Sequence, residues 1–169
     1  MPGPEFPIGP FRLDPAEPRA SLIETIAAAP ARLAGAVERL PDDRLDQPYR
    51  NWTARQIVHH LADSHMHSVI RFKWALTEER PTIKAYDERA WAALADSRDG
   101  DVADSLALLA ALHARWTTLL RSMTEAQFER TFDHPESGET VRLADALAYY
   151  AWHGRHHTAQ IEWLAARPA

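Results

Sequence analysis

The stretch WTARQIVHHLADSHMHSVIRFKWALTEE, residues 52–79, decides the fold of this chain. Thr53 is predicted to be a helix N-cap, because Gln56 stands at the third helical position and completes a capping box. Pro81 is expected to end the helix, since proline lacks the N–H that a helix interior needs. The stretch therefore predicts one long helix, which carries four histidines among its apolar residues.

Three further segments show apolar residues at helical spacing. They cover residues 17–40, 101–123 and 143–166. Four long helices of this kind predict an all-α protein, a four-helix bundle. Pro30 lies inside the first of these segments and is expected to kink or break it.

Shorter features connect the long helices. A short helix is expected over residues 85–96, and residues 131–143 (TFDHPESGETVRL) are expected to form a loop or a small hairpin before the last helix. Residues 1–16 hold five of the twelve prolines and are expected to lie as an extended arm on the surface. The whole chain, 1–169, is expected to fold as one domain.

Composition narrows the classes of function. A formal net charge of −5 disfavours a nucleic-acid binder, which would usually carry a basic stripe. The chain has no cysteine, so it forms neither a disulfide nor a thiolate metal site. Neither a signal peptide nor a run long enough to span a bilayer is recognised, so a cytoplasmic protein without membrane contact is expected.

The last predicted helix contains YYAWHGRHHTAQIEWL, residues 149–164. His153 and His157 lie four positions apart and therefore on one face, where two imidazoles can chelate one metal ion while another helix supplies a third ligand. His157 falls inside the apolar stripe of this helix and His153 at its edge. His156 points to one side of this stripe and is expected to be exposed.

The helix over residues 52–79 offers the third ligand. His60, Ser64, His67 and Arg71 share one polar face by their spacing, and a polar face on so central a helix indicates a cavity. Spacing alone does not choose between His60 and His67. A pair of histidines four apart is also a weak signal by itself. The odds that it marks a metal site are about even, because packed and surface histidines that bind no metal show the same spacing.

Several motifs together carry a resemblance that is stronger than the histidine pair. They are FPIGPF (6–11), VHHLADSH (58–65), HPESGE (134–139) and YYAWHGRHHTAQI (149–161). With them the chain resembles the YfiT branch of the DinB-like family over nearly its whole length. The resemblance implies a four-helix protein with a metal site between helices, one zinc or nickel ion per chain held by His60, His153 and His157, and a homodimer.

The resemblance also implies an activity. Several proteins of this kind are similar to S-transferases that use a low-molecular-weight thiol such as bacillithiol, and older descriptions of the group are of metal-dependent hydrolases. The prediction is therefore a metal-dependent S-transferase, whose partners are a small-molecule thiol and an electrophile. One alternative is a hydrolase in which the metal activates water. The other is a non-catalytic module in which the metal braces the bundle.

Further site residues are candidates on position. Asp63, one turn along from His60, is the candidate catalytic base or the group that orients a ligand imidazole. Arg71, with Ser64 and His67, is a candidate for binding the substrate, since an arginine can hold the carboxylates of an anionic thiol. Four aromatic residues are assigned to the core and not to the site: Trp52, Trp116, Tyr149 and Trp152.

Overall fold

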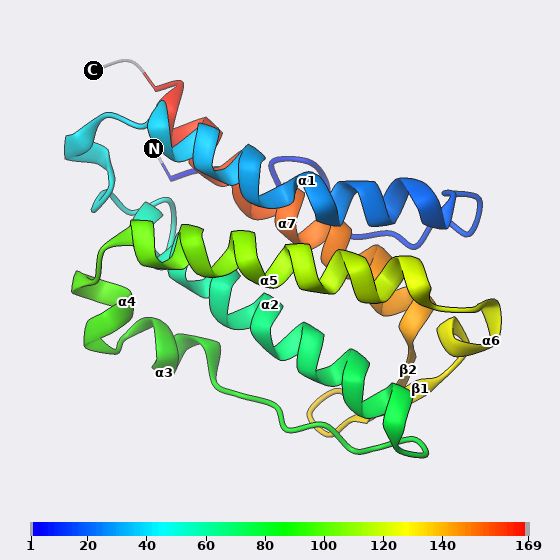
Figure 1. The fold of residues 1–169 in the computed structure, drawn as a ribbon. Coiled ribbons are helices and arrows are strands. Elements are labelled where there is room, and N and C mark those ends of the chain that lie inside the picture. The colour runs from blue at the N-terminus through cyan, green and yellow to red at the C-terminus, as the bar shows by residue number, and fades with distance from the viewer. Residues whose placement is uncertain (1, 168–169) are drawn as a thin grey trace.

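The computed structural model describes residues 2–167, except for the side chain at position 42. Its four long helices are α1 (Arg19–Glu38), α2 (Ala54–Thr77), α5 (Val102–Ser122) and α7 (Leu143–Ala165) (Figure 1). The short elements are η1 (Asp42–Arg44), α3 (Glu88–Ala92), α4 (Ala95–Asp99), α6 (Glu125–Phe128), β1 (Thr131–His134) and β2 (Glu139–Arg142). The predicted four-helix bundle, with a small hairpin before the last helix, is confirmed.

Consecutive helices are not always neighbours in this bundle. Both α1 and α2 pack against α5 and α7, so α1 and α2 stand diagonally opposite each other. The connection between them is held by buried Arg44, whose guanidinium donates to the carbonyls of Leu164 at 2.8 Å and Arg167 at 2.5 Å. Because the last carbonyls of a helix lack partners within it, Arg44 satisfies the C-terminal end of α7 and fixes the connection there.

Helix α1 runs unbroken through Pro30, so the predicted break is wrong. Leu22, Ile26 and Leu33 on both sides of the proline are buried, and packing on α5 and α7 holds the helix together. Tertiary packing outweighs the local cost of one proline, although the carbonyl one turn before Pro30 loses its helical hydrogen bond.

Helix α1 is also long and apolar enough to cross a membrane by length and composition alone. The expectation that no segment reaches this length is therefore wrong for α1. Core helices of globular proteins pass the same test, and α1 packs one face against α5 and α7. Its apolar residues thus supply the core.

The segment expected as one helix over 85–96 forms two, α3 and α4, so that prediction is wrong in its continuity. Asp87 caps α3 by accepting a hydrogen bond from the backbone N–H of Ala90 at 2.9 Å. The amide of Gln56, at the beginning of α2, donates to the carbonyl of Ala92 at 2.7 Å. Leu94 then has an extended backbone and begins α4 as its N-cap. A contact with α2 therefore replaces the continuation of α3.

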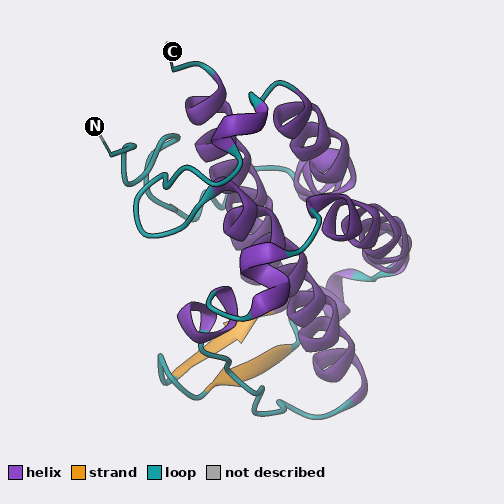
Figure 2. Ribbon diagram, turned by 90° about the vertical axis from the view of Figure 1, so that its left-hand side faces the viewer, coloured by secondary structure: helices purple, strands orange, loops and turns teal. Residues whose placement is uncertain are grey.

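The hairpin positions the segment that precedes α3. Strands β1 and β2 pair antiparallel with Phe132 opposite Val141, and Gly138 in the turn has a φ of +70°, which favours glycine. Asp133 on β1 also exchanges backbone hydrogen bonds with Pro81 and Ile83, at 2.9 and 3.0 Å. The hairpin lies at one end of the bundle (Figure 2), and through these bonds it holds the chain that leads to α3.

The N-terminal arm lies against α7. Residues 2–16 form no helix or strand; Trp152 donates from its indole N–H to the carbonyl of Gly9 at 3.2 Å. The rings of Phe6 and Phe11 pack on Trp152 at 6.4 and 5.8 Å between ring centroids. The arm therefore covers one side of α7 beside its histidines.

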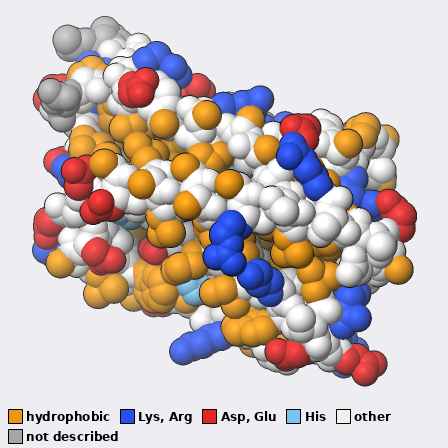
Figure 3. Space-filling model, viewed as in Figure 1, with side chains coloured by type: hydrophobic (Ala, Val, Ile, Leu, Met, Phe, Trp, Pro, Cys, Tyr) orange, Lys and Arg blue, Asp and Glu red, His pale blue; other side chains and the backbone are white. Residues whose placement is uncertain are grey.

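The apolar core has two parts. One part lies toward the hairpin and includes Phe72, Trp116 and Leu147; the other lies toward the opposite end and includes Ile57 and Ile161. On α7 the segment from 153 to 158, with its three histidines, lies between the two parts. Only small patches of histidine surface are visible on the face in Figure 3. The histidines thus form a buried polar layer inside the bundle.

Candidate metal centre

Three buried histidines from two helices converge inside the bundle. They are His60 on α2 and His153 and His157 on α7, and each offers a ring nitrogen within 4.8 Å of the others. They are 4%, 5% and 8% exposed. The Nε2 atoms of His60 and His153 are 3.3 Å apart, and the ring centroids of His60 and His157 are 5.0 Å apart. Helical spacing on α7 and the α2–α7 contact therefore build a group that could hold a metal ion.

The alternative third ligand, His67, lies elsewhere. Its ring stacks on Tyr86 at 4.2 Å and packs near Trp91 at 5.1 Å, and its Nδ1 is 2.8 Å from the carbonyl of Asp63. The structure thus brings His60, and not His67, to the pair on α7.

Burial keeps the three imidazoles neutral. Desolvation lowers the pKa of His60 to about 4. Desolvation, followed by repulsion from neighbouring imidazoles, holds the pKa values of His153 and His157 well below the usual range. Neutral imidazole is the form that binds a metal ion, so these rings need not lose a proton to do so at neutral pH.

A short hydrogen-bond chain on α7 orients His157. Its Nδ1–H donates to the side-chain oxygen of Gln160 at 2.7 Å, and the amide nitrogen of Gln160 donates to Nε2 of His156 at 3.0 Å. Since Nδ1 of His157 carries the hydrogen, its Nε2 presents a lone pair. Gln160 therefore has the role that second-layer groups commonly have around metal-binding histidines.

The expectation that His156 is exposed is wrong. His156 is 6% exposed, because its ring stacks on Trp152 at 4.7 Å and the arm residue Phe6 covers it at 5.8 Å. Its Nδ1 has no hydrogen-bond partner among the described residues. An arm contact that helical spacing does not reveal buries this histidine.

Two cavities reach the triad from different sides. The first, of about 1130 Å³, is lined by Ser64, Arg71, Glu88, Tyr149, Tyr150 and His153 among others. The second, of about 710 Å³, is lined by Trp52, Gln56, Glu88, His157 and Gln160 among others. Because Glu88 lines both, the beginning of α3 stands between the two approaches to the histidines.

The candidate substrate-binding residues are divided by the structure. Ser64 and Arg71 line the first cavity, where Arg71 donates to the hydroxyl of Tyr150 at 2.9 Å. The Nε of Arg71 is buried and has no hydrogen-bond partner among the described residues. His67 and Asp63 line neither of these cavities. Arg71 is therefore, beside Arg89, one of two cationic groups that line the first cavity.

Asp63 points toward α4 and not toward the triad. Burial, followed by repulsion from Asp96 on α4, raises its pKa to about 6. The carboxylate that reaches both cavities is Glu88, an exposed residue at the beginning of α3. Nothing in the spacing of the sequence indicated Glu88, because α3 is placed by its contact with Gln56 and not by a helical pattern shared with the histidines.

The assignment of four aromatic residues to the core is wrong for Trp52 and Tyr149, and Trp152 packs beneath the arm, outside both parts of the core. Trp116 is fully buried in the core, as predicted. The ring of Trp52, however, lies 4.6 Å from His60 and lines the second cavity. Tyr149 lies 5.7 Å from His153 and lines the first cavity. The position of Tyr149 one turn before His153 is a signal that could have placed it at the site.

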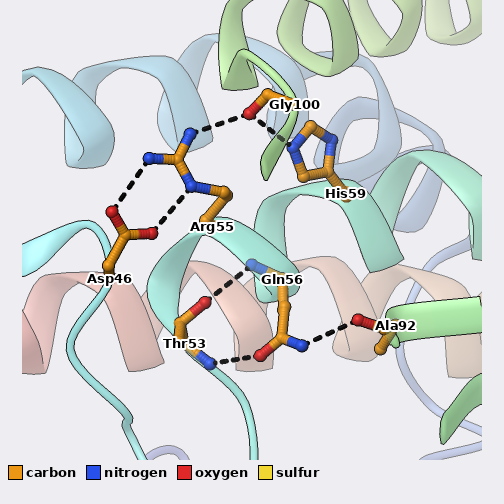
Figure 4. Close-up of polar contacts among 7 residues, drawn as sticks. All are labelled: Asp46, Thr53, Arg55, Gln56, His59, Ala92 and Gly100. Atoms are coloured by element: carbon orange, nitrogen blue, oxygen red, sulfur yellow. Dashed lines mark hydrogen bonds and ion pairs between the residues drawn. The ribbon is translucent and has the colours of Figure 1, made fainter. Parts of the chain in front are cut away.

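A second polar network fixes the beginning of α2, and Figure 4 shows it. Thr53 and Gln56 form the predicted capping box, which is confirmed. Arg55 binds the carboxylate of Asp46 at 2.7 and 3.0 Å and the carbonyl of Gly100 at 2.7 Å. His59 contacts the carbonyl of Gly100 at 3.3 Å and also the hydroxyl of Ser105, which Figure 4 does not draw, at 2.7 Å. This network holds the first two turns of α2.

Comparison with known proteins agrees with this geometry. Residues 2–161 match the model of the DinB superfamily. YfiT from Bacillus subtilis (strain 168) is 50% identical over 172 residues, covering 96% of this chain and 94% of that protein. A relative from Bacillus mycoides (strain KBAB4) is 55% identical over 148 residues, covering 86% and 84%. Both carry provisional names as metal-dependent hydrolases.

A solved structure is similar as well. The structure of YfiT from Bacillus subtilis has a TM-score of 0.90 to this chain, with 50% sequence identity and 94% of each chain covered. It is described as having an unusual four-helix bundle topology.

Proposed function

Because the chain belongs to the DinB superfamily, we propose that it is a metal-dependent S-transferase. In this proposal His60, His153 and His157 hold one divalent ion, zinc or nickel. The enzyme joins a low-molecular-weight thiol, such as bacillithiol, to an electrophilic small molecule. The names of the relatives support the metal dependence. The use of a thiol rests on the family resemblance seen in the sequence and on the residues of the site.

The observation that carries the proposal is the meeting of three buried, neutral imidazoles at one point. Ring nitrogens that offer lone pairs to one another are stabilised by a cation, and three nitrogen ligands match reactive zinc sites, which keep one position for a reactant. A divalent ion held there would lower the pKa of a thiol in that position, so that its sulfur reacts as a thiolate.

Arg71 in the first cavity suits the carboxylate of an anionic thiol, although five carboxylates also line this cavity. Arg71 is held by Tyr150 and has a buried Nε without a protein partner, so its guanidinium is available for a carboxylate of the thiol. Glu88, which lines both cavities, is placed to accept the thiol proton. The new sulfur–carbon bond forms as the leaving group departs with its bonding electron pair. The chain has no cysteine that the electrophile could modify instead.

Hydrolysis is the second candidate, and the names of the relatives favour it. The same open position would take up water, and Glu88 would serve as the base in place of Asp63. Both candidates use the same three histidines, and they differ in whether a thiol is consumed.

The experiment begins with elemental analysis of the purified protein. The metal-loaded protein is then given monobromobimane with each of several thiols, and separately a panel of esters without thiol, with the uncatalysed reactions subtracted. We expect bimane turnover that requires both metal and thiol. Ester hydrolysis without thiol, together with no thiol-dependent turnover, would overturn the transferase in favour of the hydrolase.

A matched pair of variants tests the metal site. His60→Ala removes a ring of the triad, whereas His59→Ala removes the adjacent buried histidine, which binds Ser105. We expect activity to disappear in the first variant and to persist in the second. Full activity in His60→Ala would rule out both metal mechanisms.

A further inference from the structure

A line of buried imidazoles connects the triad to helix α1. His65 Nε2 lies 3.3 Å from Nδ1 of His153, and His65 Nδ1 lies 2.7 Å from Nε2 of His113. His113 Nδ1 lies 2.6 Å from the backbone carbonyl of Ile26. His65 and His113 are each 1% exposed. The line therefore runs from α1 through α5 and α2 to a histidine of α7, away from water.

The line begins where Pro30 interrupts the hydrogen bonding of α1. A helical carbonyl normally accepts from the N–H four residues later, and the residue four after Ile26 is Pro30, which has no N–H. A buried carbonyl without a partner is costly, so it takes one from elsewhere. His113 on α5 supplies it.

This carbonyl determines where each hydrogen in the line lies. A carbonyl only accepts, so Nδ1 of His113 carries the hydrogen. A second proton on a ring so deeply buried would be costly, so the Nε2 of His113 accepts, and it does so from Nδ1–H of His65. By the same reasoning Nε2 of His65 accepts from Nδ1–H of His153. The remaining nitrogen of His153, Nε2, then presents a lone pair 3.3 Å from Nε2 of His60.

We propose that the line from the Ile26 carbonyl through His113 and His65 fixes His153 as its Nδ1–H tautomer and so aims Nε2 of His153 at the metal ion. His65 and His113 are thus positioning residues. The role of the line rests on the proposed metal site, but its hydrogen positions do not. Gln160 fixes His157 in the same tautomer. His153 and His157 therefore both turn Nε2 toward the metal site, and each is held by a different partner at Nδ1.

The hydrogen positions are measured by long-range ¹H–¹⁵N NMR of the histidine rings in the metal-free protein at neutral pH. We expect the Nδ1–H tautomer for His65, His113 and His153. An Nε2–H tautomer at any of the three rings would break the sequence of donors and overturn the proposal. Because no metal is present, this result is independent of whether the chain is a transferase.

Two substitutions of His65 separate positioning from packing. In His65→Gln the amide oxygen can accept from His153 while the amide N–H donates to His113, so the direction of the line is kept. His65→Leu removes both contacts. We expect the leucine variant to bind cobalt or zinc about 10–100-fold more weakly and the glutamine variant to bind close to wild type. Affinity is measured by competition with a chromophoric chelator, and stability is measured for each variant by urea unfolding.

The control is His59→Leu. It removes a buried histidine of the same helix whose ring contacts Ser105 and is not part of the line of imidazoles. We expect it to lose stability and keep its metal affinity. Equal metal affinity in His65→Leu and wild type would overturn the proposal, as would equal losses in His65→Leu and His65→Gln. A wild-type protein that binds no metal while showing the expected tautomers would refute the proposed function and leave the hydrogen positions standing.

Discussion

Two adjacent histidines on α2, His59 and His60, belong to regions with opposite polar chemistry. Around His59 each contact joins a donor to an acceptor, as in Arg55 with Asp46 and His59 with Ser105. Around His60, ring nitrogens of three histidines come together. The Nδ1–H groups of the two α7 histidines donate away from this point, to His65 and to Gln160. The first region is completed by the protein itself. The second also offers one ring nitrogen from each of three histidines to a cation, and this convergence is what identifies the candidate functional site.

The difference has an energetic side. Burying three imidazoles together without a partner charge departs from the usual rule for polar groups in a core, and it makes protonation of the metal-free triad costly. Local rules of this kind are commonly broken at functional sites, where a ligand restores the balance. The two regions therefore respond differently to substitution, to pH and to salt.

The largest effect separates the two histidines directly. His60→Ala is expected to lower metal affinity by more than about 100-fold, since even partners of a ligand cost 10–100-fold. His59→Ala is expected to keep its metal and to lose about 1–3 kcal/mol of stability, because Ser105 loses its partner. Chelator competition and urea unfolding of both variants measure this. Equal loss of metal in the two variants would erase the distinction between the regions.

The metal-free protein should lose stability in acid through the triad. The pKa of His60 is about 4 in the folded protein and 6.5 without burial, so below about pH 6.5 the unfolded chain binds more protons. The contribution is fully present above pH 6.5 and is lost as pH falls toward 4, amounting to about 3 kcal/mol for this ring at ~1.4 kcal/mol per pKa unit. Urea unfolding of apo wild type and His60→Ala at several pH values measures it. A variant as acid-sensitive as wild type would contradict it.

The capping box of the first region gives a smaller effect. Thr53→Ala removes the acceptor for the N–H of Gln56 and is expected to cost about 1 kcal/mol of stability, whereas Thr53→Ser should cost less. Both variants should bind metal as wild type does, because His60 lies two turns further along. Thermal unfolding with and without zinc tests this; a weakened metal site in Thr53→Ala would mean that the two regions are coupled.

The smallest effect is at the exposed ion pair. Asp46 is 65% exposed, so Asp46→Ala is expected to cost only about 0.2–1 kcal/mol, despite its two hydrogen bonds to Arg55. The cost should shrink further in high salt, because salt screens exposed charges. Unfolding at low and high salt measures it. A loss that is large and insensitive to salt would show that this pair is stronger than its exposure implies.

Much of the fold follows from local pattern. The four long helices, the cap at Thr53 and the hairpin were predicted from apolar spacing and turn residues. The continuity of α1 through Pro30 and the division of residues 85–96 were not, because both depend on contacts with other helices. Such contacts join residues far apart in sequence, where spacing carries no signal.

The site divides in the same way. The pairing of His153 with His157 follows from a four-residue step, whereas choosing His60 over His67 needed a family resemblance. The burial of His156 depends on the arm, and the place of Glu88 depends on α3. Spacing therefore predicted the pair of histidines that shares one helix face. It missed the features that depend on contacts between several elements, such as the burial of His156 and the position of Glu88.

X-ray absorption spectroscopy of the zinc-loaded protein tests the central claim most directly, because it counts the imidazoles bound to the metal. The account predicts three imidazole nitrogens at about 2.0–2.1 Å and one further light atom that is not from the protein. Adding a thiol substrate should replace that atom with sulfur at about 2.3 Å. Fewer than three imidazoles around the zinc would contradict the account.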